Sequence, residues 1–296
     1  MKISVWLVFA VYCLLASAAW IATPVPDGGR FFERQAGLFA VVGLGAAVFA
    51  GKDLWAPARR LPWARLAIAG VGFWGVPVCL IRWAGSGVPS IVISAAFALL
   101  PAVVVLVVSS IGGVEDNGEG WGFLAPALAA FGGVLLMLPV GLPESVRGQL
   151  MLGVAFAAVL LVAVSGVWVH QLMQGGALRV TIAIVCFANA VFLMISGLVT
   201  GDFVGRWNGW AGILSLSFGV DLIQMILAFW LLREMPPVRF ATRYLVIPLL
   251  TVVEGYVVLR PEVTARMGTG AVLVAGGAVW ILFSKKSDDG GILSLR

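Results

Sequence analysis

The chain has 296 residues, of which 61% are hydrophobic and 11% charged, and its net charge is +5. A soluble domain carries about 25% charged residues, so the few charges here cannot cover a water-soluble globule of this size. The apolar runs are continuous, which excludes an outer-membrane β-barrel, and the thinly spread basic charge argues against nucleic-acid binding. The composition therefore predicts an all-α integral membrane protein whose main partner is the lipid bilayer.

Ten apolar segments follow one another along the chain, and each is long enough to cross a bilayer as a helix of about 20 residues. The expected spans are 3–22, 35–51, 65–83, 89–110, 120–139, 149–169, 180–200, 210–232, 241–259 and 268–284. The connections are short, which leaves no room for a soluble domain. The first segment also resembles a secretory signal peptide, with Lys2 before the apolar run and Ala16-Ser17-Ala18-Ala19 at its end. Cleavage there is an open alternative.

Basic residues predict the orientation of these spans. With the amino terminus in the cytoplasm, more lysines and arginines fall in the cytoplasmic connections than in the outer ones. Many tryptophans fall at span ends, as expected for side chains at the membrane interface. We therefore expect a multi-pass protein of the bacterial inner membrane with both termini in the cytoplasm.

The two halves of the chain, 1–145 and 146–296, resemble each other. Five helices per half is an odd number, so the second half would cross the membrane in the opposite direction to the first. Inverted repeats of this kind are typical of secondary transporters. When Pro89 is aligned with Pro236 without a gap, the scarcer residue types that also coincide are Trp63 with Trp210, Trp83 with Trp230, Pro101 with Pro248, and Glu115 with Glu262.

Ionisable residues inside a span are functional candidates, because a charge at the centre of a bilayer costs about 2.5–3.5 kcal/mol. Asp221 lies at the centre of the expected span 210–232 and shares one helix face with Ser217 and Gln224. Such a polar stripe is expected to face a cavity, where Asp221 would bind a proton or a cationic substrate. The alternative is a structural hydrogen bond to a neighbouring helix.

The remaining candidates are weaker. Glu254 lies in the ninth expected span, near Pro248, which we expect to act as a hinge together with Pro101. Two arginines near span ends either extend to the lipid headgroups, pair with Asp221 or Glu254, or attract an anionic substrate. These are Arg82 and Arg243; the weakest candidates are Asn189 and Trp74, the latter being aligned with Asp221 in the repeat.

Enzyme and cofactor motifs are missing from the sequence. It has no P-loop, no nucleophile elbow, and only one histidine, His170, which excludes the His-Glu-x-x-His zinc motif. The three cysteines lie inside apolar runs without metal-binding spacing. We therefore expect no enzymatic activity, no cofactor and no metal site.

The chain resembles the EamA-like permeases of the drug/metabolite transporter superfamily over nearly its whole length. The residues that carry the resemblance are, in the first half, Val88-Pro89-Ser90-Ile91, Leu100-Pro101, Glu115 and Gly132-Gly133, and in the second half Met235-Pro236, Ile247-Pro248, Glu262, Gly268 and Gly276-Gly277. The first half departs from the family at 115–119, where an acidic stretch replaces a short basic turn. The resemblance implies ten helices around a central cavity lined mainly by helices one to four and six to nine, with the fifth and tenth at the periphery or in oligomer contacts.

These observations predict a secondary transporter that exports a small metabolite by alternating access. In one form of this prediction, export is coupled to proton movement. The alternative function is a membrane-embedded lipid-modifying enzyme or a non-transporting assembly subunit. The expected partners are a small-molecule substrate and the bilayer, for a monomer or a homodimer.

Overall fold

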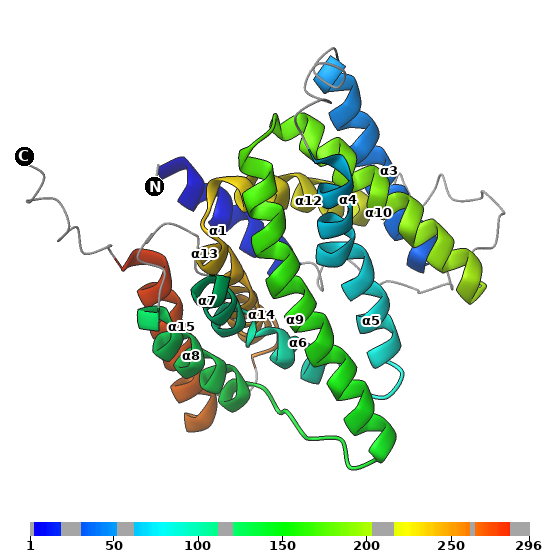
Figure 1. Cartoon of the computed structure of the whole chain (residues 1–296). Coiled ribbons are helices and arrows are strands. Elements are labelled where there is room, and N and C mark those ends of the chain that lie inside the picture. Colours follow the sequence, from blue (N-terminus) through cyan, green and yellow to red (C-terminus); the bar gives the residue numbers. More distant parts are fainter. Residues whose placement is uncertain are drawn as a thin grey trace, which may run out of the picture.

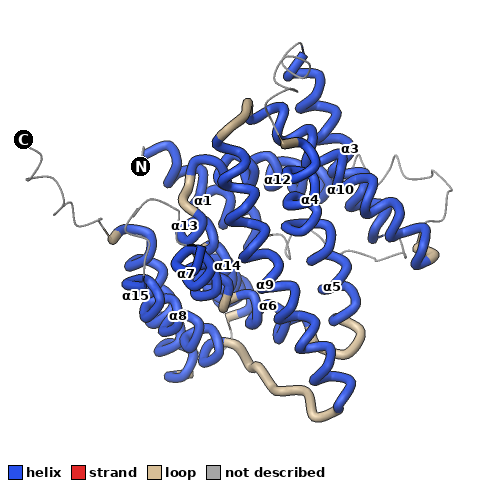
Figure 2. Tube along the Cα trace, viewed as in Figure 1, coloured by secondary structure: helices blue, strands red, loops and turns tan. Residues whose placement is uncertain are grey.

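The computed structural model describes residues 3–18, 31–51, 62–111, 121–202, 216–260 and 264–284. Within these ranges the chain is helical and contains no strand (Figure 2). Seven helical segments of the described chain are long and apolar enough to cross a membrane, which fits a multi-pass α-helical membrane protein. They are Phe31–Ala50, Trp63–Ala84, Ser90–Ser110, Val146–Gln174, Leu178–Thr200, Pro237–Leu259 and Ala265–Phe283.

Helix is present in every one of the ten ranges expected from the sequence. The first half contains α1 (Ile3–Ser17), α3 (Phe31–Ala50), α4 (Trp63–Gly70), the π-helix η3 (Val71–Gly75), α5 (Val76–Ala84), α6 (Ser90–Phe97), α7 (Leu100–Ile111), the 3₁₀ turn η4 (Trp121–Phe123) and α8 (Leu124–Met137). The second half contains α9 (Val146–Gln174), α10 (Leu178–Thr200), α12 (Leu216–Glu234), α13 (Pro237–Ala241), α14 (Arg243–Leu259) and α15 (Ala265–Phe283).

In the fourth and ninth segments two shorter helices follow each other, and the first of the two starts after a proline. Pro89 precedes α6 with φ −59° and ψ 145°, and Pro236 precedes α13 with φ −55° and ψ 146°. The fourth segment is interrupted between α6 and α7, and the ninth at Thr242 between α13 and α14. Pro101 is the second residue of α7, where its missing N–H costs little, whereas Pro248 lies inside α14 and leaves a backbone carbonyl without its helical bond.

The helix α9 is longer than its expected span of 149–169. The side chain of Ser145 caps it by accepting a hydrogen bond of 3.0 Å from the backbone N–H of Gly148. No proline interrupts the following 29 residues, and the helix ends at Gln174, just before two glycines. This helix therefore runs the full length of the bundle (Figure 1).

The helices pack in pairs drawn from the two halves of the chain. The helix α3 packs along α10, and α8 packs along α15 at the lower left edge of the molecule (Figure 1). The helix α9 contacts α4, η3, α5 and α7, while α1 contacts α12 and α14. The helix α1 is thus part of the bundle, with Phe9, Cys13 and Ser17 buried.

Glycine allows the closest of these contacts. A Cβ atom at Gly270 of α15 would lie 2.6 Å from the carbonyl oxygen of Gly133 in α8, and one at Gly133 would lie 2.7 Å from the carbonyl of Gly270. The backbones of α8 and α15 therefore touch, as small residues allow in membrane helices.

Large apolar side chains cover the outside of the bundle. Examples are Val48, Phe49, Val199 and Val272, each more than 70% exposed. In water such a surface would be unfavourable, but it matches the hydrocarbon of a bilayer.

Several sequence predictions fall on residues outside the described ranges. These are Glu115, Glu262 and Trp210, together with the side chain of Ser217.

Candidate functional site

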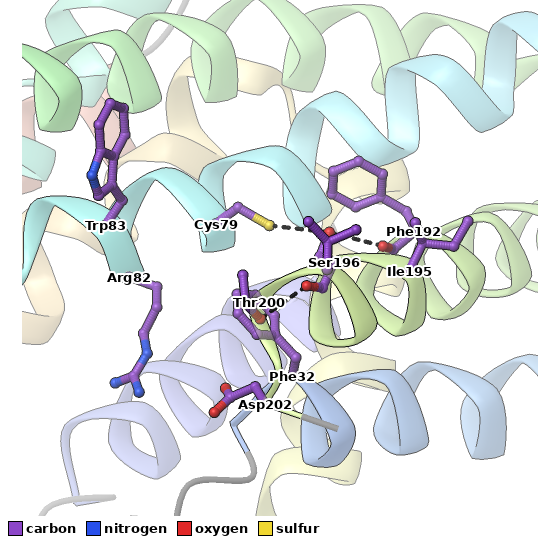
Figure 3. A pocket seen from close by; sticks show the side chains of 10 residues that line it. Phe32, Cys79, Arg82, Trp83, Phe192, Ile195, Ser196, Thr200 and Asp202 are labelled. Atoms are coloured by element: carbon purple, nitrogen blue, oxygen red, sulfur yellow. Dashed lines mark hydrogen bonds between the residues drawn. The ribbon is translucent and has the colours of Figure 1, made fainter. Parts of the chain in front are cut away.

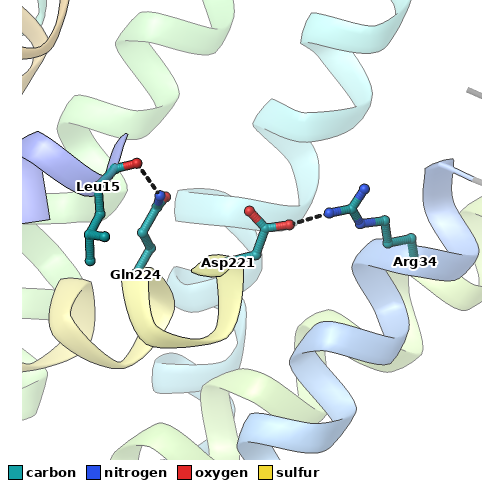
Figure 4. Close-up of polar contacts among 4 residues, drawn as sticks. All are labelled: Leu15, Arg34, Asp221 and Gln224. Atoms are coloured by element: carbon teal, nitrogen blue, oxygen red, sulfur yellow. Dashed lines mark hydrogen bonds and ion pairs between the residues drawn. The ribbon is translucent and has the colours of Figure 1, made fainter. Parts of the chain in front are cut away.

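An ion pair joins Asp221 of α12 to a residue that the sequence analysis did not select. The Nη2 atom of Arg34, in the first turn of α3, lies 2.6 Å from Oδ2 of Asp221 (Figure 4). Both side chains are about one third exposed, at 32% and 31%. Arg34 lies directly before the expected span 35–51, whereas α3 starts at Phe31 and therefore includes Arg34 in its first turn.

Gln224 faces a different helix from Asp221. Its Nε2 donates a hydrogen bond of 2.9 Å to the backbone carbonyl of Leu15, near the end of α1 (Figure 4). The last carbonyls of a helix have no partner within the helix, so the amide satisfies one of them. The expected polar stripe on α12 therefore divides between α3 and α1 instead of lining one common space.

Glu254 of α14 also contacts the end of α1. The hydroxyl of Ser17 lies 2.6 Å from Oε1 of Glu254 and 3.1 Å from the carbonyl of Leu14. The second carboxylate oxygen, Oε2, is buried and has no hydrogen-bond partner among the described residues. The residues Ser17, Gln224 and Glu254 thus form a polar cluster around the end of α1, here called the α1 junction.

Arg243 is the most deeply buried of the charged candidates, with 5% of its surface exposed. Its guanidinium carbon lies 3.6 Å from the ring centroid of Phe240, 4.5 Å from that of Tyr244 and 5.9 Å from that of Phe73. Nη1 donates to the carbonyl of Phe240 at 3.2 Å, and Nη2 to the hydroxyl of Tyr244 at 3.3 Å. Aromatic faces attract a guanidinium, by about 2 kcal/mol when it is desolvated, but they leave its charge uncompensated.

Arg82 lines an open cavity of about 590 Å³ between the ends of α3, α5 and α10 (Figure 3). Its guanidinium lies 5.4 Å from the ring centroid of Phe31. Figure 3 shows Arg82 and Asp202 at the same end of this cavity, with Cys79, Ser196 and their neighbours above them. Oδ2 of Asp202 is buried without a partner among the described residues. A volume of this size suits a small organic ligand.

Neither Arg82 nor Arg243 pairs with Asp221 or Glu254. The single ion pair of the described residues joins Asp221 to Arg34, while Glu254 is bound by Ser17. In this structure Asp221 is bound by Arg34 and Glu254 by Ser17, so neither arginine takes up the pairing that the sequence analysis left open.

Trp74 and Asn189 lie where the third segment packs on its neighbours. Trp74 belongs to the π-helix η3, and its ring contacts those of Phe73 and Phe229 at centroid distances of 4.3 and 4.6 Å. Asn189 of α10 is fully buried and donates to the carbonyl of Val185 at 2.8 Å. Its Oδ1 faces Gly75, where a Cβ atom would lie 2.8 Å away. Both residues pack between helices and do not line the 590 Å³ cavity.

His170 is bound at the opposite end of the bundle from the cavity. Its Nδ1 lies 2.6 Å from the carbonyl of Leu232, which links α9 to α12. Within the described residues, no group of three or more histidine, cysteine, aspartate or glutamate side chains is arranged to hold a metal ion.

No family model and no curated protein matches the chain. The fold is similar to that of a solved protein described only as "Crystal structure of protein". The TM-score is 0.72 over 96% of this chain and 98% of that one, at 17% sequence identity. At this identity the likeness shows a shared fold over almost the full length of both chains.

Proposed function

We propose that the chain is a secondary transporter of a small metabolite that works by alternating access. In this proposal it crosses the membrane ten times, as two inverted five-helix repeats, and belongs with the EamA-like permeases of the drug/metabolite transporter superfamily. It exports its substrate across a bacterial inner membrane, with both termini in the cytoplasm, as a monomer or a homodimer.

The packing of the helices supports the two-repeat arrangement. An exchange of the halves replaces α1 by α9, α3 by α10, the α4–η3–α5 segment by α12, α6–α7 by α13–α14, and α8 by α15. The α3–α10 and α8–α15 pairs then map onto themselves. The contacts of α9 with α5 and α7 map onto those of α1 with α12 and α14. The matching prolines before α6 and α13 agree with the same exchange.

The observation that carries the transport proposal is the distribution of polar contacts between the halves. Three of them join a helix of the first half to a helix of the second: Arg34 with Asp221, Ser17 with Glu254, and the carbonyl of Leu15 with Gln224. Contacts between helices that move against each other must break and re-form, and polar contacts do so more readily than a packed apolar core.

The proposal is tested at Asp221. A thermal-shift screen of small metabolites on the detergent-purified protein first identifies a stabilising compound, which is used as the substrate. Its flux is then followed in proteoliposomes with an imposed pH gradient. Asp221→Asn should reduce uphill accumulation at least about tenfold, because the neutral amide no longer holds Arg34 across the two halves. Its unfolding temperature is measured in parallel, so that a loss of flux caused by unfolding is recognised.

Glu234→Gln is the matched control, because it removes an exposed carboxylate from the end of the same helix. This variant should transport like the wild type. Wild-type accumulation by Asp221→Asn would refute the role of Asp221, and no protein-dependent flux of any stabilising compound would refute transport.

A further inference from the structure

Arg243 is a buried cation without an anion. Among the described residues no carboxylate lies within ion-pair distance of its guanidinium, and its two hydrogen bonds go to a neutral carbonyl and a neutral hydroxyl. Glu254, on the same helix, lies eleven positions further along and is bound to Ser17 of α1. The positive charge is thus held inside the bundle with no neutralising group from the described chain.

The guanidinium is oriented by its surroundings and keeps free donors. It carries five N–H donors, and the hydrogen bonds from Nη1 and Nη2 use two of them. The rings of Phe240 and Tyr244 hold its plane. A fixed guanidinium with several free donors matches the two oxygens of a carboxylate or the oxygens of a phosphate.

Arg243 lies where helices of the two halves meet, beside a small internal cavity. It lines a cavity of about 20 Å³ together with Phe73 of η3, Val104 of α7 and Gly166 of α9, and it interacts electrostatically with Tyr12 of α1. Helices of both halves therefore meet at this residue. The cavity holds about one water molecule, so a larger ligand requires movement. The interruption at Thr242, directly before Arg243, is a place where α14 can tilt.

We infer that Arg243 is the binding site for the acidic group of the transported solute, so that the substrate is a small organic anion carrying a carboxylate or a phosphate. The assignment of a transported substrate rests on the proposed function, but anion binding at Arg243 does not. Binding is therefore measured on the purified full-length protein, separately from flux.

The probes are inorganic phosphate and acetate, with acetamide as the uncharged counterpart of acetate, all at one ionic strength. Phosphate or acetate should raise the unfolding temperature of the wild type in a saturable way, and acetamide should not. Arg243→Gln should lose this response. Its own unfolding temperature without anion should stay the same or rise, because a buried unpaired charge has been removed. Arg179→Gln, which removes an exposed arginine from α10, should keep the response.

If Arg243 only supports the fold, anions will not act through it. No anion response in the wild type, or an equal response in Arg243→Gln, would overturn the inference. If Arg243→Gln fails to fold, Arg243→Lys is measured instead, because it keeps the charge but loses the planar guanidinium. Anion binding at least about tenfold weaker than in the wild type supports the site. Anion binding equal to that of the wild type overturns the inference. Anion binding without flux of any solute would leave the site standing and refute transport alone.

Discussion

Arginine side chains near helix ends in this chain bind the carbonyls of neighbouring helices. Arg179 donates to the carbonyl of Phe49 near the end of α3, and Arg266 to that of Leu135 near the end of α8. The final carbonyls of a helix carry partial negative charge and have no partner in the helix, so a cation stabilises them. These arginines therefore have a structural use that is separate from orienting the chain, whereas Arg34, Arg82 and Arg243 face other side chains or a cavity.

The hydrogen bonds between Glu254, Ser17 and Leu14 can be arranged in two ways. The serine hydroxyl has one proton but lies within hydrogen-bond distance of both Glu254 and the carbonyl of Leu14. An ionised Glu254 would accept from Ser17; a protonated Glu254 would donate to Ser17, which then donates to Leu14. The charge on Glu254 thus decides how the end of α1 is held.

We predict that Glu254→Gln strongly reduces proton-driven accumulation of the substrate but leaves substrate exchange. The amide is permanently neutral and donates as the protonated acid does, so the α1 junction is held in one arrangement. Uphill flux in proteoliposomes should fall at least about tenfold, while counterflow of labelled substrate continues. Glu234→Gln again serves as the control, and accumulation by Glu254→Gln at the wild-type level would contradict the prediction.

At the scale of elements, interruptions occur in the third, fourth and ninth segments. The third segment contains a π-helix at Trp74, the fourth is interrupted just before Leu100-Pro101, and the ninth is interrupted at Thr242. Such interruptions free backbone groups and let a helix bend, and π-turns are frequent at functional sites. By contrast, α8 and α15 are uninterrupted and pack through glycines, which suits a static pair.

The α8–α15 contact gives a stability prediction. In Gly270→Ala the added Cβ would lie 2.6 Å from the carbonyl oxygen of Gly133 and 2.8 Å from the backbone nitrogen of Met137, so the two helices must separate. Overpacking of this kind costs about 1–3 kcal/mol, and the unfolding temperature in detergent should drop by several degrees.

Gly276→Ala is the matched control on the same helix, because nothing lies within 4 Å of its added Cβ. Alanine favours a helix over glycine, so this variant should be as stable as the wild type or slightly more stable. Equal unfolding temperatures for the two variants would show that α8 and α15 do not approach as closely as described.

At the scale of the whole molecule, one large cavity opens at the end where α3 begins and where α5 and α10 end. If both termini are cytoplasmic, that end faces away from the cytoplasm. Cys79 lines this cavity, with its Sγ 3.6 Å from the hydroxyl of Ser196, whereas Cys13 and Cys186 are buried. The reactivity of the Cys79 thiol therefore reports on which side of the membrane this cavity is open.

We predict that a membrane-impermeant thiol reagent labels Cys79 in intact cells and that Cys79→Ser removes the labelling. A transporter that alternates between two openings should change the labelling rate when substrate is added, since the cavity closes in part of the cycle. Labelling only in inverted vesicles would reverse the orientation, and a rate that never responds to substrate would argue against movement at this cavity.

The sequence by itself determined the helical class and the approximate positions of the helical segments, because both depend on local composition. Long apolar runs must become helices in lipid, and prolines and glycines mark where those helices end or break. The sequence also singled out Asp221, Gln224, Glu254, Arg82 and Arg243 as polar groups inside or at the ends of those helices. Their chemistry alone makes them exceptional at such depth.

Only the tertiary structure decided which of these groups meet. Arg34 was missed as the partner of Asp221, and Ser17 as the partner of Glu254, because these contacts join residues far apart in the chain. The division of Asp221 and Gln224 between two neighbouring helices could not be seen from their shared face either. The isolation of Arg243 likewise depends on every helix around it, since a charge is paired or unpaired only in three dimensions.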